Sequence, residues 1–374
     1  MDLFRCMMAP EAGDAVKRVL TPDANGRVYC GQGRLVDEFE TEFANTIGLQ
    51  AGHPPLGVNS CTAAIDLALH LIGVGDGDEV IVSPMTCSAT NGCAVLRGAS
   101  LVWADVDPQT GLMDPASVAR MVTKKTAAVI AVDWAGRWCD YENLHAAAGW
   151  KVPIIEDAAH CLYIPQAHGD YVAWSFGPIK HLSCGGYGGA LLVPEHQYNR
   201  AELLRWHGLD RRSSADFRCA QDIGEVGYRY HLTDDQAAVG LANLPMVPGN
   251  IQLARAHAAL YCRQLRDVKG VHVPPYDEEC DYWLHGLIVE QDRDAFAQAL
   301  ATVGIPTSRT HARNDNHTAY RQASLRQDGS LPGTTYFDDH QINIPGGAWL
   351  GWEDCRMVLT TVKAVARATA KVVV

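Results

Sequence analysis

Two charged side chains, Asp157 and Lys180, stand 23 residues apart at positions where a folded chain often places its chemistry. Asp157 ends the apolar run VPIIED, while Lys180 ends the run AWSFGPIK and precedes a glycine-rich loop, GGYGG. A lysine amine can form a Schiff base with an aldehyde, and a carboxylate can keep a pyridine nitrogen protonated. Pyridoxal phosphate (PLP) needs both groups, so PLP chemistry is the leading hypothesis.

Neither residue is specific alone, because an aspartate at a strand end is more often a helix cap or a turn residue. A third feature is the turn NSCT at 59–62, which precedes a helix expected to begin near Ala63. Free amides and a hydroxyl at a helix N-terminus form a natural phosphate site. Taken by itself, this turn is more simply an N-cap by Ser60 or Thr62. The combination of turn, aspartate and lysine favours the cofactor.

The elements that must position these residues alternate along the chain. Short β-rich runs such as EVIVSP, SLVWADVD and AAVIAVDW are separated by helix-length segments such as TNGCAVLRG, DPASVARMVT and YENLHAAAG. This alternation predicts an α/β fold with a mainly parallel sheet flanked by helices, and two further strands at 171–176 and 189–193. Ligands of such sheets bind beyond the carboxyl ends of the strands, which is where Asp157 and Lys180 are expected.

The pattern changes near residue 250, where MVPGN (246–250) is typical of a hinge. A helical stretch follows, then a strand candidate at 283–290, the helix RDAFAQALATVG and a C-terminal helix at 354–371. We therefore expect a large PLP-binding domain over residues 1–250 and a smaller C-terminal α+β domain over 251–374.

Bulk composition narrows the function classes. With 47% hydrophobic and 20% charged residues the 374-residue chain is neither disordered nor fibrous, and its net charge of −12 argues against nucleic-acid binding. No apolar run reaches signal-peptide or transmembrane length, and the twelve cysteines show no C-x-x-C pair or zinc spacing. We expect a cytoplasmic protein with reduced thiols, without a metal and without a membrane partner.

The ordered set of segments resembles the DegT/StrS nucleotide-sugar aminotransferases, which are PLP enzymes of the aspartate aminotransferase fold (fold type I). The matching segments are GQGRLVDEFETEFA, NSCTAAIDLAL, GDEVIVSPMTCSAT, VWADVD, IEDAAH, SFGPIKH and GYRYHLTDDQAAVGL. The resemblance runs from about residue 28 to 245 and resumes weakly at 304–315. Seven motifs in the right order are far more specific than any one of them.

The resemblance implies a role for each matching residue. Lys180 would be the Schiff-base lysine, Asp157 the partner of the pyridine nitrogen, and His160 a neighbour of the cofactor's phenolic oxygen. Cys87 falls where many members place a side chain over the face of the ring.

The phosphate positions of the family match Cys61, Thr62 and Ser175. Arg229 falls where the family commonly has a side chain that reaches the neighbouring subunit's phosphate, which implies a homodimer with shared active sites. Arg229 and the basic residues at 205–212 could also hold phosphate or the donor's carboxylates. Two departures are local: the usual Gly-Thr of the phosphate turn is Cys61-Thr62, and the loop GGYGG is one residue longer than usual and lacks an acid.

The implied function is transfer of an amino group from an amino acid, with glutamate the expected donor, to a keto sugar, most simply one linked to a nucleotide. An aminocyclitol precursor is an alternative acceptor. A PLP-dependent sugar dehydratase is a second alternative. That branch of the family replaces the lysine by histidine, so Lys180 argues against a dehydratase, whereas the adjacent His181 keeps this alternative open. A non-catalytic regulator that kept the fold is a third.

Overall fold

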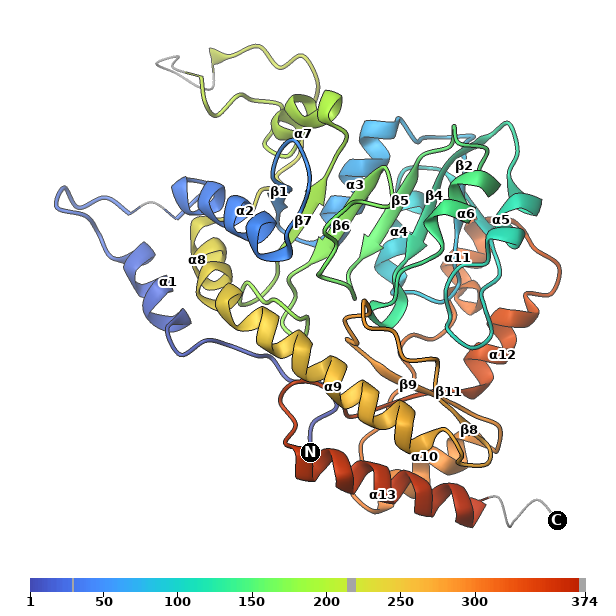
Figure 1. Ribbon diagram of the computed structural model, residues 1–374. Coiled ribbons are helices and arrows are strands. Elements are labelled where there is room, and N and C mark those ends of the chain that lie inside the picture. Colours follow the sequence, from blue (N-terminus) through green and yellow to red (C-terminus); the bar gives the residue numbers. More distant parts are fainter. Residues whose placement is uncertain (29, 214–219, 370–374) are drawn as a thin grey trace.

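The computed structural model describes residues 1–28, 30–213 and 220–369 and contains two sheets (Figure 1). The larger sheet has the strand order β1-β7-β6-β5-β4-β2-β3-β10. Its strands are β1 (Leu56–Val58), β2 (Glu79–Val82), β3 (Ser100–Trp103), β4 (Thr126–Val132), β5 (Ile154–Ala158), β6 (Tyr171–Ser175), β7 (Gly189–Leu192) and β10 (Ser324–Gln327). Strands β2 to β6 and β10 run parallel, and β7 is antiparallel to both of its neighbours. The predicted mainly parallel sheet is confirmed.

The central strands are buried on both faces, which explains their continuous apolar sequence. Successive side chains of a strand point to opposite faces. In β2, Val80 and Val82 therefore pack in one cluster with the helices of one face, whereas Ile81 packs in another cluster with the helices of the other face. The result is a three-layer arrangement in which the sheet lies between two layers of helices.

Helices cover both faces of this sheet (Figure 1). They are α2 (Arg34–Ile47), α3 (Cys61–Ile72), α4 (Ser88–Leu96), α5 (Pro115–Met121), α6 (Tyr141–Ala147), α7 (Tyr198–Leu204) and α8 (Asp234–Asn243), whereas α1 (Ala12–Leu20) packs against α8. Helix α3 begins after Ser60, whose Oγ accepts a hydrogen bond from the Ala63 amide at 3.1 Å, and ends at Gly73 with φ +92°. A left-handed glycine is a usual way to end a helix.

The C-terminal part contains the antiparallel sheet β11-β9-β8 and a core of its own. Its elements are α9 (Val247–Leu265), β8 (Val271–His272), β9 (His285–Val289), α10 (Arg293–Thr302), α11 (Thr318–Ala323), α12 (Pro332–His340), β11 (Gln341–Ile344) and α13 (Trp352–Thr369). The predicted smaller α+β region is confirmed. The expected last helix is α13, and its predicted last two residues, 370 and 371, lie outside the described residues.

The hinge expected at 246–250 is wrong, because these residues are helical. Helix α8 leads through the short 3-10 turn η4 (Leu244–Met246) directly into α9, which spans both parts of the molecule (Figure 1). Pro248 lies in the first turn of α9, where a backbone N–H has no acceptor within the helix, so proline costs the helix no hydrogen bond. In addition, β10 returns from the C-terminal part to pair with β3 in the large sheet. The division at residue 250 stays a prediction.

Candidate active site

Asp157 is the penultimate residue of β5 and is 2% exposed. Its Oδ2 accepts a hydrogen bond from Thr90 Oγ1 at 2.7 Å, and its Oδ1 accepts one from the Ala159 amide at 3.1 Å and one from Cys61 Sγ at 3.6 Å. Burial raises the pKa of Asp157, while these donors and the charge of Lys180 oppose that rise. The carboxylate is therefore held in one orientation by neighbours from three elements.

Lys180 lies in the turn that follows β6, where its amide donates to Gly177 O at 3.1 Å. Its Nζ is 3.6 Å from the centroid of the Trp283 ring. Burial lowers the pKa of Lys180 to about 8, and the charge of Asp157 limits the fall. The amine can therefore lose its proton close to neutral pH, as a nucleophilic or basic lysine must.

His160, which follows β5, is 3% exposed and stacks on Trp283 with ring centroids 4.0 Å apart and an interplanar angle of 21°. Its Nδ1 lies 3.3 Å from the Ala135 amide. Because an amide can only donate, Nδ1 is the acceptor and Nε2 carries the proton of the neutral ring. Burial, reinforced by the charge of Lys180, lowers the pKa of His160 well below its usual value.

The expected phosphate positions meet at one corner of the sheet. Ser175 pairs in register with Gly189 of β7, and a Cβ on Gly189 would lie 2.6 Å from Ser60 C and 2.7 Å from the Cys61 amide nitrogen. Only glycine lets β7 approach the turn this closely. Thr62 is in the first turn of α3, whereas the Cys61 thiol points toward Asp157 and the Ala173 carbonyl (3.5 Å).

Cys87 and Arg229 are both exposed. Cys87 immediately precedes α4, and its charge would stabilise protonated Lys180, so it belongs to the same site. Arg229 adjoins the phosphate turn through its backbone, because its carbonyl accepts a hydrogen bond from Asn59 Nδ2 at 3.1 Å. Its neighbour Tyr230 donates to Asp66 of α3 at 3.0 Å. In this extended segment the Arg229 side chain is therefore directed away from α3.

The basic segment 205–212 is partly structural. Arg205 is buried and forms an ion pair with Glu40, and its Nη1 donates to Gly57 O at 3.0 Å. Arg212 pairs with Glu202 at 2.9 Å. The expectation that this segment holds substrate anions does not apply to Arg205, because a buried, paired guanidinium has no route to a ligand.

Three residues at this site were missed by the sequence reasoning: Thr90, Trp283 and His311. Thr90 opens an expected helix and Trp283 opens an expected strand, so both positions have ordinary structural explanations. The His311 ring lies 5.6 Å from the His160 ring, and burial lowers its pKa to about 4. His311 lies in the segment 304–315, where the resemblance to the family is weak. Only the fold brings these residues from distant parts of the chain to Lys180.

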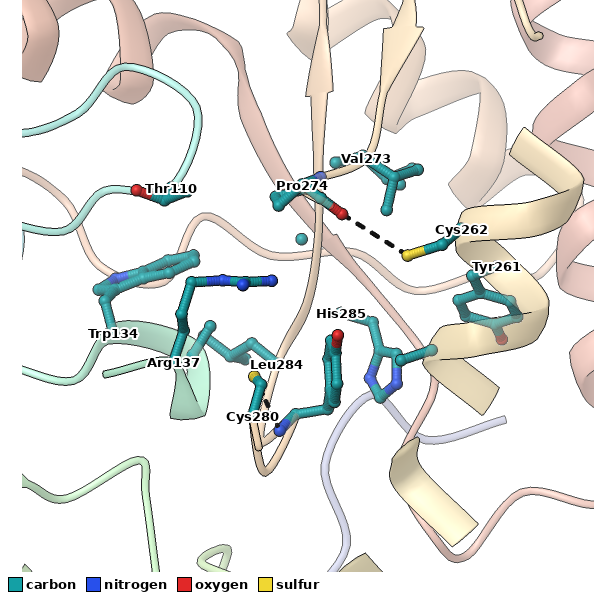
Figure 2. Close-up of a pocket in the computed structure, with 15 residues that line it drawn as sticks. Thr110, Trp134, Arg137, Tyr261, Cys262, Val273, Pro274, Cys280, Leu284 and His285 are labelled. Carbon is teal, nitrogen blue, oxygen red and sulfur yellow. Dashed lines mark hydrogen bonds between the residues drawn. The ribbon is translucent and has the colours of Figure 1, made fainter. Parts of the chain in front are cut away.

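A separate cavity lies between α9 and the approach to β9 (Figure 2). Its lining is mainly apolar, and Arg137 at its edge is already paired with Asp277 at 3.0 Å. Ala135 lines this cavity and also bonds to His160, so the two sites share a wall. None of the predicted site residues lines it, and the candidate active site is the corner around Lys180.

The donor set around Lys180 fits PLP: a buried carboxylate, an amine of lowered pKa and a glycine-lined helix N-terminus. Among the described residues, no cluster of three or more His, Cys, Asp or Glu side chains could hold a metal ion, and no helix is long and apolar enough to cross a membrane.

Comparisons with known proteins agree with this chemistry. The family model described as "DegT/DnrJ/EryC1/StrS aminotransferase family" matches residues 12–363. The spore coat polysaccharide biosynthesis protein SpsC of Bacillus subtilis is 32% identical over 71% of this chain and 70% of its own length. Its name places it in polysaccharide biosynthesis.

Solved structures are similar over nearly the whole chain. AtS13 from Actinomadura melliaura is 33% identical with a TM-score of 0.88, and covers 97% of this chain and 98% of its own. The sugar aminotransferase CalS13 from Micromonospora echinospora is 30% identical with a TM-score of 0.85 over 97% and 99%. DesV of S. venezuelae, solved with a ketimine intermediate, is 27% identical with a TM-score of 0.84 over 95% and 94%. The chain belongs to the DegT/DnrJ/EryC1/StrS aminotransferase family and is a PLP-dependent aminotransferase of the sugar type.

Proposed function

We propose that this aminotransferase moves an amino group from an amino acid, with glutamate as the donor, to a keto sugar linked to a nucleotide. The observation that carries the proposal is the convergence of the Lys180 amine and the Asp157 carboxylate beside a helix N-terminus at the carboxyl end of a parallel sheet. Similarity to sugar aminotransferases over nearly the whole chain supports the sugar acceptor.

When bound, PLP supplies an electron sink for the bond that is broken next to the transferred nitrogen. Asp157 contributes the negative charge that keeps the ring nitrogen protonated. Its hydrogen bonds from Thr90 and Ala159 favour the ionised carboxylate and fix its direction, so the charge is already in place when it is needed.

Lys180 holds the cofactor through Nζ and then acts as the acid and base of the reaction. With a pKa of about 8, Nζ can accept a proton from a substrate carbon and return it without a large energetic penalty in either direction. The neutral His160 ring offers its Nε2–H as a donor, and its lowered pKa prevents it from competing with Lys180 for the proton.

Ser60, Thr62 and Ser175 would hold the phosphate, together with amides of the α3 N-terminus. Cys61 contributes its amide to this turn, while its thiol donates to Asp157. Cys87, which immediately precedes α4 and whose charge would act on Lys180, is the residue that we propose for the face of the cofactor ring.

We also propose that the enzyme is a homodimer that works in the cytosol. The eleven cysteines in the described part of the chain are free thiols, which suits a reducing compartment. Arg229 is exposed beside the phosphate turn and directed away from its own α3, as expected of a side chain that reaches a neighbouring subunit.

The test treats the two halves of the reaction separately. Glutamate alone should convert the bound cofactor to its amine form, seen as a change in its absorption. A panel of nucleotide-linked keto sugars should then restore the original spectrum and yield an amino sugar identified by mass spectrometry. Amination of a cyclitol ketone with no nucleotide sugar accepted, or loss of water from the sugar without amination, would replace the proposal by one of its alternatives.

A further inference from the structure

The side chain of Trp283 connects three parts of the active site. It is 7% exposed and precedes β9 in the C-terminal part of the chain. Its Nε1 donates to the carbonyl of Ile179, the residue before Lys180, at 2.8 Å. The Lys180 Nζ lies 3.6 Å from the ring centroid, and the His160 ring stacks on the same indole at 4.0 Å.

This arrangement places the Lys180 ammonium against the face of an indole, and the indole of tryptophan attracts cations more strongly than the other aromatic side chains do. The attraction comes from the ring quadrupole and grows when the pair is shielded from water. Burial has the opposite effect on Lys180, because it disfavours the ammonium form. The indole therefore acts to raise the pKa of Lys180, whereas burial of the amine acts to lower it.

We propose that Trp283 is a positioning residue that provides the resting place of the Lys180 amine whenever this amine is not bonded to the cofactor. The inference rests on the role proposed above for Lys180. Each turnover releases the amine and later requires it again at the same carbon. A site 3.6 Å above the indole, anchored through Ile179 to the lysine's own turn, keeps the released amine from swinging away.

The other groups that face Lys180 do not replace this contact. Asp157 favours the ammonium, as do Cys61 and Cys87 when ionised, whereas His160, His181 and His311 would oppose it when charged. Burial lowers the pKa of all three histidines and raises that of Cys61, so these four side chains are neutral near pH 7. Among the buried groups, Asp157 and the indole face are then those that favour the ammonium.

The experiment measures the proton affinity of Lys180 directly rather than through turnover. The enzyme is loaded with pyridoxamine phosphate, which leaves the lysine amine free. Brief labelling with an amine-acylating reagent from pH 6 to 10, followed by mass spectrometry of the Lys180 peptide, gives its apparent pKa. Removing the indole face in Trp283→Leu should lower this pKa by about one unit, and Trp283→Phe by less, because phenyl rings attract cations more weakly.

A substitution can also disturb packing, so a second measurement leaves the side chain in place. Replacing the nine tryptophans by 5-fluorotryptophan withdraws electron density from each ring at nearly constant shape, and should lower the Lys180 pKa as well. Trp150→Leu, at an exposed tryptophan, is the matched control and should leave the pKa unchanged.

The outcomes separate this inference from the proposed function. Borohydride reduction of the wild-type PLP enzyme should label Lys180; a label elsewhere would overturn the function itself. With Lys180 labelled, an unchanged pKa in both folded Trp283→Leu and fluorinated protein would show that the indole only fills space. If Trp283→Leu fails to fold, the Lys180 pKa is compared between the wild type and the Trp283→Phe and fluorinated proteins instead. If this pKa falls in neither of them, the proposed positioning role of Trp283 is wrong.

Discussion

At the residue scale, the site depends on two groups whose surroundings shift their proton affinities in useful directions. Burial lowers the pKa of Lys180 to about 8, and it raises the pKa of Asp157 against three hydrogen-bond donors. Neither shift is visible in the sequence, because it depends on which groups surround the side chain. The residue types at 157 and 180 nevertheless suffice to suggest the chemistry.

Replacing Lys180 by alanine should abolish transamination and leave the fold intact, because the lysine supplies a covalent and acid–base group and little core packing. Circular dichroism and the melting temperature check the fold, and both half-reactions check the activity. Lys151→Ala, at an exposed lysine, is the control. Retained conversion of the cofactor by glutamate in the variant would contradict the assignment.

The pH dependence of the wild-type enzyme provides a second check on Lys180. The free amine is neutral above its pKa of about 8 and charged below it. In the amine form of the enzyme, labelling of Lys180 by an amine reagent should therefore fall about tenfold for each pH unit below about 8 and level off above it. A midpoint near the ordinary lysine value of 10.5 would show that the amine is not desolvated.

Asp157→Asn should still bind PLP but turn over slowly, because an amide cannot supply the charge that keeps the ring nitrogen protonated. Removal of one preorganised electrostatic contact typically costs about 3–4 kcal/mol, or roughly 10²–10³ in rate. Single-turnover rates with glutamate measure the loss. Thr90→Val, which removes the 2.7 Å donor to Oδ2 together with the acceptor of the Thr86 Oγ1 hydrogen bond (3.1 Å), should lose much less, and Thr90→Ser, which keeps both, should recover it. Turnover of Asp157→Asn within threefold of wild type would rule out this role.

At the element scale, the site is formed where strand ends meet a helix N-terminus. The alternation of strands and helices predicted the parallel sheet, because strands such as Glu79–Val82 are short, β-branched and bounded by turn residues. The hinge at 246–250 was predicted wrongly because Pro248 and Gly249 suggest a break, whereas proline is compatible with the first turn of a helix. Local sequence does not distinguish these two contexts.

Other parts of the site could not be predicted because they depend on contacts between distant segments. Trp283 and Lys180 are far apart in the chain, and neither the 3.6 Å contact of Nζ with the indole nor the Nε1 bond to Ile179 leaves a pattern in the sequence. The Cys61 thiol is a related case. Its position in the phosphate turn follows from the resemblance, but the direction of its side chain toward Asp157 follows only from the packing of α3 beside β5.

Gly189→Ala tests the corner where β7 meets the phosphate turn. The new Cβ would lie 2.6 Å from both Ser60 C and Trp174 O, so the corner between the turn and β6 must open, at a cost of about 1–3 kcal/mol. We expect at least a tenfold weaker affinity for PLP, measured by titrating the cofactor-free protein. Gly186→Ala, in the same loop, meets nothing within 4 Å and is the matched control. Equal affinities for the two variants would show that the turn does not bind the phosphate.

At the scale of the whole molecule, the proposed dimer depends on Arg229. Its carbonyl is fixed to Asn59 next to the phosphate turn, but its side chain is exposed and directed away from α3. A cation in this position can complete a phosphate site in a second copy of the chain. In a two-fold dimer, the same contact then occurs twice.

The proposed dimer can be tested by complementation between two inactive chains. If Arg229 acts on the partner's site, mixing Lys180→Ala chains with Arg229→Ala chains should restore activity, because each mixed dimer has one site with both residues intact and one with neither. Random exchange should give about a quarter of wild-type activity, since half the dimers are mixed and one of their two sites works. Differently tagged chains verify exchange, and the Arg229→Ala parent must be clearly impaired. Mixed dimers without any gain in activity would place Arg229 in its own chain's site or outside the chemistry.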